Sequence, residues 1–177
     1  MPQRSTTRAF TSVLALIASF GTASAAETDI TIGMQLEPPH LDPTSAAAGA
    51  IDNVVYSNIF EGLTRFMGDG SVVPGLAKSW DISDDGLRYT FHLRGDVQFH
   101  DGTAMDAADV KFSLDRARAE DSTNAQKALF AGIADVAVID PLTVALTLEA
   151  PNGNLLFNLA WGDAVIVAPE TIETIKS

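Results

Sequence analysis

Two of the three histidines in this chain, His92 and His100, lie in one short stretch, and Asp101 directly follows the second. Imidazole and carboxylate groups are common zinc ligands and common general acids and bases in enzymes. A metal-binding protein or a metal-dependent enzyme that uses these three residues is therefore one hypothesis for the chain.

The side-chain pattern around the histidines favours a structural role instead. Side chains alternate between the two faces of a strand, and in both Arg88–Arg94 and Val97–Phe99 the apolar residues claim the core face. His92 and His100 therefore lie on the opposite face, and their spacing matches no metal-binding motif. Asp101 begins an Asp–Gly pair, which is typical of a turn. The residues assigned to the core face are Tyr89, Phe91, Leu93, Val97 and Phe99.

The rest of the sequence contains no recognisable catalytic motif. There is no GxSxG motif and no glycine pattern that binds phosphates or dinucleotides. The chain has no cysteine, which excludes disulfides and thiolate metal ligands. The carboxylates of Asp69, Asp84 and Asp85 lie in turns, where aspartate is common. We predict that the protein is not an enzyme and has no catalytic residue, metal ligand or cofactor.

Residues 1–25 have the features of a secretory signal peptide. Arg4 and Arg8 precede the apolar run Ala9–Phe20, and Ala23–Ala25 reads as an A-x-A cleavage signal. The apolar run is too short to span a bilayer as a mature helix, and no cysteine follows the cleavage signal to carry a lipid anchor. We therefore expect a freely diffusing periplasmic protein.

The net charge of the chain argues against nucleic acid as a partner. The formal charge is −12, and the predicted leader holds two arginines and no acidic residue, so the exported part is more acidic still. Phosphate backbones require lysine and arginine for binding. Acidic character also favours solubility but does not indicate a fold.

Short strands, short helices and turns alternate along the exported part, which predicts a mixed α+β fold. An antiparallel meander is predicted where Ser79–Ile82 and Arg88–Arg94 flank the turn Ser83–Gly86 and the chain turns again into Val97–Phe99. The other predicted strands are Asp29–Met34, Leu63–Phe66, Leu142–Leu148 paired with the segment around Val136–Val138, and Ala164–Ala168. The predicted helices are Ala50 to Gly62, Asp106 to Ala117, Thr123–Ala131, Asn154–Leu159 and one that begins at Pro169.

One of these helices carries a clear start signal. Asp106 is a suitable N-cap, and Asp109 resembles the second member of a capping box. The stripe Val110, Leu114 and Ala117 predicts the face that packs on the core. Phe112 lies off this stripe, so we expect it to contact a second neighbour.

Two further segments could shape a ligand site. Glu37–Pro43 contains three prolines, which allow neither a helix nor a strand ladder and predict an ordered extended loop. Trp161 lies at a predicted helix-to-strand junction, a place where pockets often form, although packing in the core is an equally good interpretation. Trp80 lies within a predicted strand and is assigned to the core.

The run Gly75–Gly86, continued by LRYTFHLRGDVQFHDGTAMDAADVKFSLDRA, resembles the signature of extracellular solute-binding proteins of family 5. These are the peptide-, oligopeptide- and nickel-binding proteins of ABC importers. Leu41–Pro43, Asn58–Leu63 and Val165–Pro169 extend the resemblance over essentially the whole exported chain. Arg88 departs from the usual threonine-like residue, at a strand position that affects no functional assignment.

The resemblance implies a periplasmic binding protein type II-like fold, in which two lobes enclose a cleft. On this basis residues 26–62 are the first segment of lobe I, and residues 63–177 are an inserted small α/β domain that is truncated near its end. Family members are longer, so the remainder of lobe I and the opposite lobe would lie outside this chain.

The resemblance also implies a function and a site. The protein would be the substrate-binding component of an ABC importer, a monomer that captures a peptide or similar small solute and delivers it to an inner-membrane permease. The loop before Leu41 lines the cleft in such relatives, so Glu37–His40 are candidate ligand-binding residues; a rigid connector without ligand contact is the alternative for the loop. Trp161 is a further candidate because of its predicted junction position. The metal hypothesis and a stand-alone structural domain remain competing interpretations. The candidate ligand-binding residues of the loop are Glu37, Pro38, Pro39 and His40.

Overall fold

The computed structural model describes residues 30–45, 49–56 and 58–172. The chain divides into two units, Met1–Met34 and Gln35–Ser177. The predicted signal peptide lies outside the described residues. In the first unit, the described part of the predicted strand Asp29–Met34 forms no regular secondary structure, so that prediction is wrong for residues 30–34. Alternation of apolar residues favours a strand only where a second strand completes its backbone hydrogen bonds.

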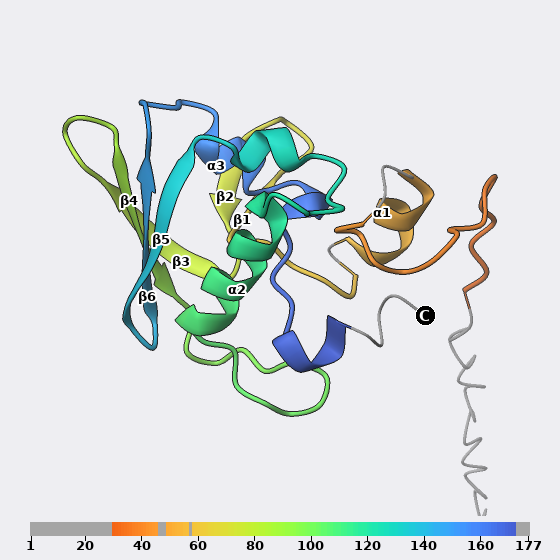
Figure 1. Cartoon of the computed structure of the whole chain (residues 1–177). Helices are drawn as coiled ribbons and strands as arrows, with labels where there is room; N and C mark the ends of the chain where they lie inside the picture. Colours follow the sequence, from red (N-terminus) through yellow and green to blue (C-terminus); the bar gives the residue numbers. More distant parts are fainter. Residues whose placement is uncertain (1–29, 46–48, 57, 173–177) are drawn as a thin grey trace, which may run out of the picture. The chain divides into compact units, whose positions relative to one another are not determined.

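A four-stranded antiparallel sheet is the centre of the second unit. Its strands are β3 (Ala77–Ile82), β4 (Arg88–Leu93), β5 (Ile133–Asp140) and β6 (Thr143–Leu148), in the order β3-β4-β6-β5. Figure 1 shows the sheet with helix α2 against it. The predicted hairpins β3–β4 and β5–β6 are both confirmed.

Local chemistry explains the β3–β4 turn. Gly86 has φ 69°, a left-handed conformation that glycine adopts without strain. The Asp85 carboxylate accepts hydrogen bonds from the Leu87 amide at 3.0 Å and the Ser83 hydroxyl at 2.6 Å. Leu87 and the rest of β4 are thereby directed back along β3 in antiparallel register.

The predicted meander is wrong in its third strand. Gln98 makes only an isolated bridge to Ala104, and the free edge of β4 pairs with β6 instead. The six residues of β6 form a longer ladder with β4 than Val97–Phe99 could. The sequence next to β4 does not indicate this pairing. Val97 and Phe99 still pack, half-buried, against the core, and His100 lies in the loop that follows.

Helix α2 (Ala107–Arg118) begins where the sequence predicts. The Asp106 carboxylate accepts from the Ala108 amide at 2.7 Å, and Asp109 returns a bond by accepting from the Asp106 amide at 2.8 Å. This reciprocal capping box satisfies amides that have no partner within the helix.

The core forms where α2 covers the sheet. Val110, Leu114 and Ala117 are buried against the apolar face that carries Phe91 and Leu146. Protein cores are densely packed, so a change in the volume of any of these side chains lowers stability. The predicted core residues Tyr89, Phe91 and Leu93 are confirmed, and Trp80 packs half-buried on the same core.

Phe112 lies on the other side of α2 and contacts a second apolar cluster. That cluster contains Val165, Val167 and Ile172, so the expectation of a second neighbour for Phe112 is confirmed. Because two clusters share one helix, α2 joins the sheet to the segment that follows Trp161.

The remaining elements are short. The two-stranded ribbon β1–β2 pairs Thr64–Phe66 with Val72–Pro74. The other short helices are α1 (Gly49–Val55), η1 (Lys127–Phe130), α3 (Leu155–Asn158), η2 (Gly162–Ala164) and η3 (Pro169–Thr171).

Several predicted elements are longer than those that form. The helices predicted to Gly62, over Thr123–Ala131 and to Leu159 shrink to α1, η1 and α3. Ala164–Ala168 is buried as expected but is not a sheet strand, since only Val165 makes a bridge, to Gly62. In these places the backbone binds distant segments, as when the Ile166 amide donates to the Glu61 carbonyl at 2.9 Å.

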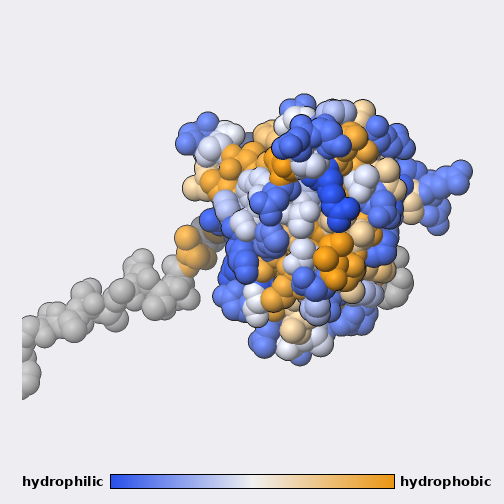
Figure 2. All heavy atoms as spheres, turned by 90° about the vertical axis from the view of Figure 1, so that its left-hand side faces the viewer, coloured by the Kyte–Doolittle hydropathy of each residue, from blue (hydrophilic) through white to orange (hydrophobic). Residues whose placement is uncertain are grey.

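The surface beside β4 is mainly polar. Figure 2 views the left-hand side of Figure 1 and shows hydrophilic residues interrupted by small apolar patches. Exposed apolar residues on the sheet include Ile82 and Val138, and isolated exposed residues of this kind are normal for soluble domains. Within the described ranges, none of the helices has the length and apolar character required to cross a membrane.

A close backbone contact beside β2 generates a stability prediction. A Cβ at Gly75 would lie 2.6 Å from the carbonyl oxygen of Gly62, whereas a Cβ at Gly68 would meet nothing within 4 Å. We expect Gly75→Ala to lower the free energy of unfolding by about 1–3 kcal/mol, because the backbones must separate. Urea unfolding measures the change, and Gly68→Ala is the matched control. Equal stability of the two variants would contradict the tight contact.

Candidate functional site

The structure places the histidines and Asp101 in separate local contacts. His92 Nε2 lies 2.8 Å from the Asp81 carboxylate across the β3–β4 hairpin. The Asp101 carboxylate accepts from the Thr103 hydroxyl at 2.7 Å and the Thr103 amide at 2.9 Å, and these bonds lower the pKa of Asp101. The predicted turn is therefore confirmed. In the part of the chain that the structure describes, no three histidine, cysteine or acidic residues are grouped to hold a metal.

A hollow lies beside the His100 turn. Its volume is about 430 Å³, and it opens where residues 58–61, 97–101 and 166–168 meet. Apolar side chains, including Phe60, Phe99 and Ile166, make up most of its wall. Such a lining suits packing against another apolar surface better than orienting a polar solute.

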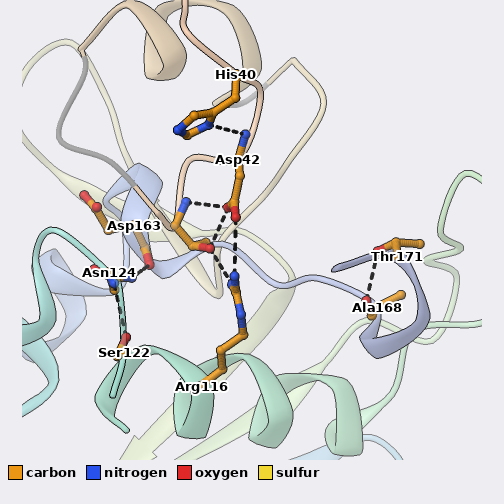
Figure 3. A network of polar contacts seen from close by, with 9 residues as sticks. His40, Asp42, Arg116, Ser122, Asn124, Asp163, Ala168 and Thr171 are labelled. Atoms are coloured by element: carbon orange, nitrogen blue, oxygen red, sulfur yellow. Dashed lines mark hydrogen bonds and ion pairs between the residues drawn. The ribbon is translucent and has the colours of Figure 1, made fainter. Parts of the chain in front are cut away.

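A different face collects polar groups from distant parts of the sequence. Asp42 is fully buried, and its carboxylate lies 3.3 Å from the Arg116 guanidinium at the end of α2. It also accepts from the Thr44 amide at 2.9 Å and the Thr44 hydroxyl at 2.6 Å, and Arg116 donates to the same hydroxyl. Figure 3 shows this network, which fixes the end of the proline-rich loop to α2.

The loop that the Asp42–Arg116 pair holds contains the four predicted ligand-binding residues. Glu37 and Pro39 are exposed, whereas Pro38 and His40 are half-buried. His40 Nδ1 accepts from the Asp42 amide at 3.2 Å, so in the neutral ring the proton resides on Nε2. His40 is therefore oriented to offer an N–H donor on its outer edge.

Next to this loop, Asn124 holds the segment that contains Asp163. Its side-chain amide donates to the Asp163 carbonyl at 2.9 Å (Figure 3). Its side-chain oxygen accepts from the Gln126 amide at 2.9 Å. Asn124 is buried, and Ser122 fixes it further by accepting from its backbone amide at 3.2 Å. The chain after α2 thus positions the chain around Trp161.

The Asp52 carboxylate of α1 approaches this segment beside Asp163. The Asp52 carboxylate on α1 lies so close to Gly162 that a Cβ there would be 2.4 Å from its oxygen. Burial and the neighbouring Asp52 charge raise the pKa of Asp163 to about 6. A hydrogen bond from its own backbone amide acts in the opposite direction. Burial also raises the pKa of Asp52.

Trp161, the fifth predicted site residue, lies in an aromatic cluster at the surface. Its ring is 6.1 Å from those of Phe66 and Phe157, and it keeps 37% of its surface exposed. The hydroxyl of Tyr56 donates to the Ala160 carbonyl, which ties α1 to the same segment. Trp161 is therefore both partly exposed and packed against other rings, and its contact with a ligand stays a prediction.

Sequence reasoning missed most of the residues that build this face. Arg116 was one of many charged residues on α2, and Asn124 fell in a predicted helix. Asp52 and Asp163 carry no motif at all. A signal existed only for Asp42, which belongs to the Leu–Asp–Pro pattern cited for the family resemblance.

The face brings together several kinds of polar and aromatic groups. It combines an oriented imidazole, loop backbone groups, two carboxylates and an aromatic cluster, on a mixed α/β scaffold with the periplasmic binding protein type II-like fold. The fold is that of the periplasmic binding proteins to which this chain is similar. Residues 71–175 match the family described as bacterial extracellular solute-binding proteins, family 5 Middle, and the chain belongs to this family.

Individual relatives agree with this assignment. The glutathione-binding protein GsiB of Pectobacterium atrosepticum is 39% identical over 132 residues, which is 75% of this chain and 26% of the relative. The PBP AgaA of A. tumefacien R10, solved in complex with agropinic acid, has a TM-score of 0.74 and 32% identity, over 80% of this chain and 29% of that one. DppA of Helicobacter pylori, solved with the peptide STSA, has a TM-score of 0.66 and 28% identity over 77% and 30%. The chain thus spans about a quarter to a third of the length of these relatives.

The buried ion pair should be important for stability. We expect Asp42→Asn to lower the free energy of unfolding by about 2–4 kcal/mol, since Arg116 would lose its charged partner in a partly buried position. The control is Asp96→Asn, which breaks an exposed pair with Arg94 and should cost less than about 1 kcal/mol. Chemical unfolding of both variants measures the difference. Equal costs would show that the loop is not held by this charge pair.

The raised pKa of Asp163 makes a stability prediction with a defined pH window. The folded protein resists ionisation of this carboxyl group, so its ionisation lowers stability as pH rises from about 4 to about 6. We expect Asp163→Asn to be more stable than the parent by about 2 kcal/mol at pH 7 and equal to it near pH 4. Thermal unfolding of both proteins across this range measures the difference. A stability gain that does not change with pH would contradict the assignment.

Proposed function

We propose that the protein is the solute-binding component of an ABC importer and that its solute is a peptide or a similar small molecule. Membership of family 5 carries this proposal. The names of the relatives support it, since they include a glutathione-binding protein and a structure with a bound peptide. In this function the protein binds its solute without chemical change and is not an enzyme.

The proposal includes a location and partners. The protein acts in the periplasm as a monomer, after export by its signal peptide, and it delivers the solute to an inner-membrane permease. Residues 26–62 begin lobe I, and residues 63–177 are the inserted small α/β domain. In the longer protein, closure of two lobes is favoured because the solute contacts both of them.

In this proposal the loop residues Glu37, Pro38, Pro39 and His40, together with Trp161, contact the solute. The Asp42–Arg116 pair supports this role because it holds the loop in one conformation before binding, which reduces the entropy cost of association. Proline contributes in the same way by restricting the backbone. Backbone groups of the loop can pair with an extended peptide.

A binding assay tests the proposal and its site together. Isothermal titration calorimetry of the protein at its natural length, with glutathione and a set of di- to tetrapeptides, should give saturable binding. We expect His40→Ala to weaken that binding about 3- to 10-fold, because one hydrogen bond is lost. His100→Ala is the matched control and should leave the affinity unchanged. Absence of binding to every peptide would overturn the proposal.

The same control variant separates solute binding from the metal hypothesis. Metal analysis after dialysis should find no stoichiometric zinc or nickel whose retention depends on His100. Stoichiometric metal that is lost in His100→Ala, with no peptide binding, would favour a metal-binding protein instead.

A further inference from the structure

We propose that the apolar hollow beside the His100 turn is the docking site for an apolar segment of the longer polypeptide, one that follows Ser177 in the sequence. The hollow has a volume of about 430 Å³ and opens where residues 58–61, 97–101 and 166–168 meet. This contact goes beyond the proposed function, because it concerns how this unit joins the rest of the protein. It rests on membership of a family of longer proteins and not on the identity of the solute.

The hollow separates two apolar clusters. Leu76 and Met105, on one part of its wall, belong to the main core, whereas Phe60 and Val167, on another part, belong to the smaller cluster that Phe112 contacts. A domain normally has one contiguous core, with smaller clusters beneath loops. An apolar side chain that entered the hollow would contact both clusters and join them into one core.

Two segments with strand-like sequences border the hollow. Val97–Phe99 and Ala164–Ala168 both have the apolar pattern of a strand, but in the described ranges each makes an isolated bridge and not a ladder. Side chains of both segments, among them Phe99 and Ile166, line the hollow. Because strand-forming residues are stabilised by neighbours that pack on the same face, an apolar neighbour in the hollow would stabilise both segments.

Apolar side chains remain exposed around the opening. Ile59 keeps 43% of its surface exposed, and Phe60, Val97 and Phe99 are only half-buried. Removal of apolar surface from water is favourable, and a contiguous apolar recess lets a single partner cover several side chains at once. The hollow therefore differs from the isolated exposed residues on the sheet.

The length and direction of the chain identify the occupant. The chain spans 26% to 30% of the relatives described above, so most of the polypeptide of such a protein lies outside it. Thr171 lines the hollow and Ile172 is the last described residue, so the described part of the chain ends next to the hollow. The end of η3 and the loop after β4 lie on the same side of the molecule (Figure 1). A segment that follows soon after is the occupant with a low entropy cost, because loop closure costs less for shorter loops.

Two other occupants fit less well. A second copy of this chain carries the same formal charge of −12, so the two copies repel each other. A polar solute requires several hydrogen-bonding groups that converge on it. The charged groups of the hollow, Glu61 and Asp101, are exposed, and the buried part of its lining is mainly apolar.

Thiol labelling of single-cysteine variants tests the inference on the protein at its natural length. Ile59→Cys and Gln98→Cys place a thiol at the hollow, and Ile82→Cys on β3 is the matched control, since Ile82 is 48% exposed and Ile59 43%. We expect a maleimide to label both hollow variants at least tenfold more slowly than the control under native conditions, and all three at equal rates in denaturant. Equal rates under native conditions would show an open hollow and overturn the inference.

The conditions of labelling identify the other occupants. Protection that appears only after a peptide is added would assign the hollow to the solute. Protection that weakens on dilution would assign it to a second copy of the chain. Either result would overturn the inference.

Photo-cross-linking identifies the protecting segment. Benzoylphenylalanine in place of Gln98, followed by irradiation and peptide mass spectrometry, should give cross-links within one molecule to apolar residues beyond Ser177. Cross-links confined to residues 1–177, or formed to another molecule, would contradict the proposal. Calorimetry measures solute binding separately, so an open hollow would leave the proposed function intact, and a failure to bind peptides would leave the protection of the hollow measurable.

Discussion

The packing of α2 against the sheet is the interaction on which the rest of the structure depends. The stripe Val110, Leu114 and Ala117 closes the core over β5 and β6. The same helix holds the Glu37–His40 loop through Arg116, and its Ser113 hydroxyl binds both the amide and the carbonyl of Val167. One helix buried on one side therefore positions, from its other sides, both segments that form the candidate binding face.

The binding face combines a stabilised part and a destabilised part. Asp42 is neutralised by Arg116 and contributes rigidity, whereas the charge of Asp52 acts on Asp163 and raises its pKa. Proteins retain such unfavourable arrangements mainly where they serve binding or catalysis. Among the described residues, every buried side-chain nitrogen and oxygen has a hydrogen-bond partner.

Local patterns in the sequence predict local structure well here. The β3–β4 turn, the capping box at Asp106 and the core face of β4 depend on residues within a few positions of one another, so they follow from alternation and capping rules. The errors occur where a choice of partner was required. Val97–Phe99 has strand character, but β6 competes successfully for the edge of β4, and the helix predicted to Gly62 ends at Val55. No local pattern contains the information on which of two segments pairs better.

By itself, the sequence determined the local turns, the capped helix, most strands of the main sheet and the family. Apolar periodicity, turn residues and the GLAKSWDISDDG signature are properties of contiguous residues, and they also placed Glu37–His40 in an ordered loop. Only the tertiary structure decided which charges meet: that Arg116 neutralises Asp42, that Asn124 holds Asp163, and that Asp52 reaches Gly162. The physical reason is that electrostatic and hydrogen-bonding energies depend on distance in space and on burial, and folding brings together groups that are separated by tens of residues along the chain.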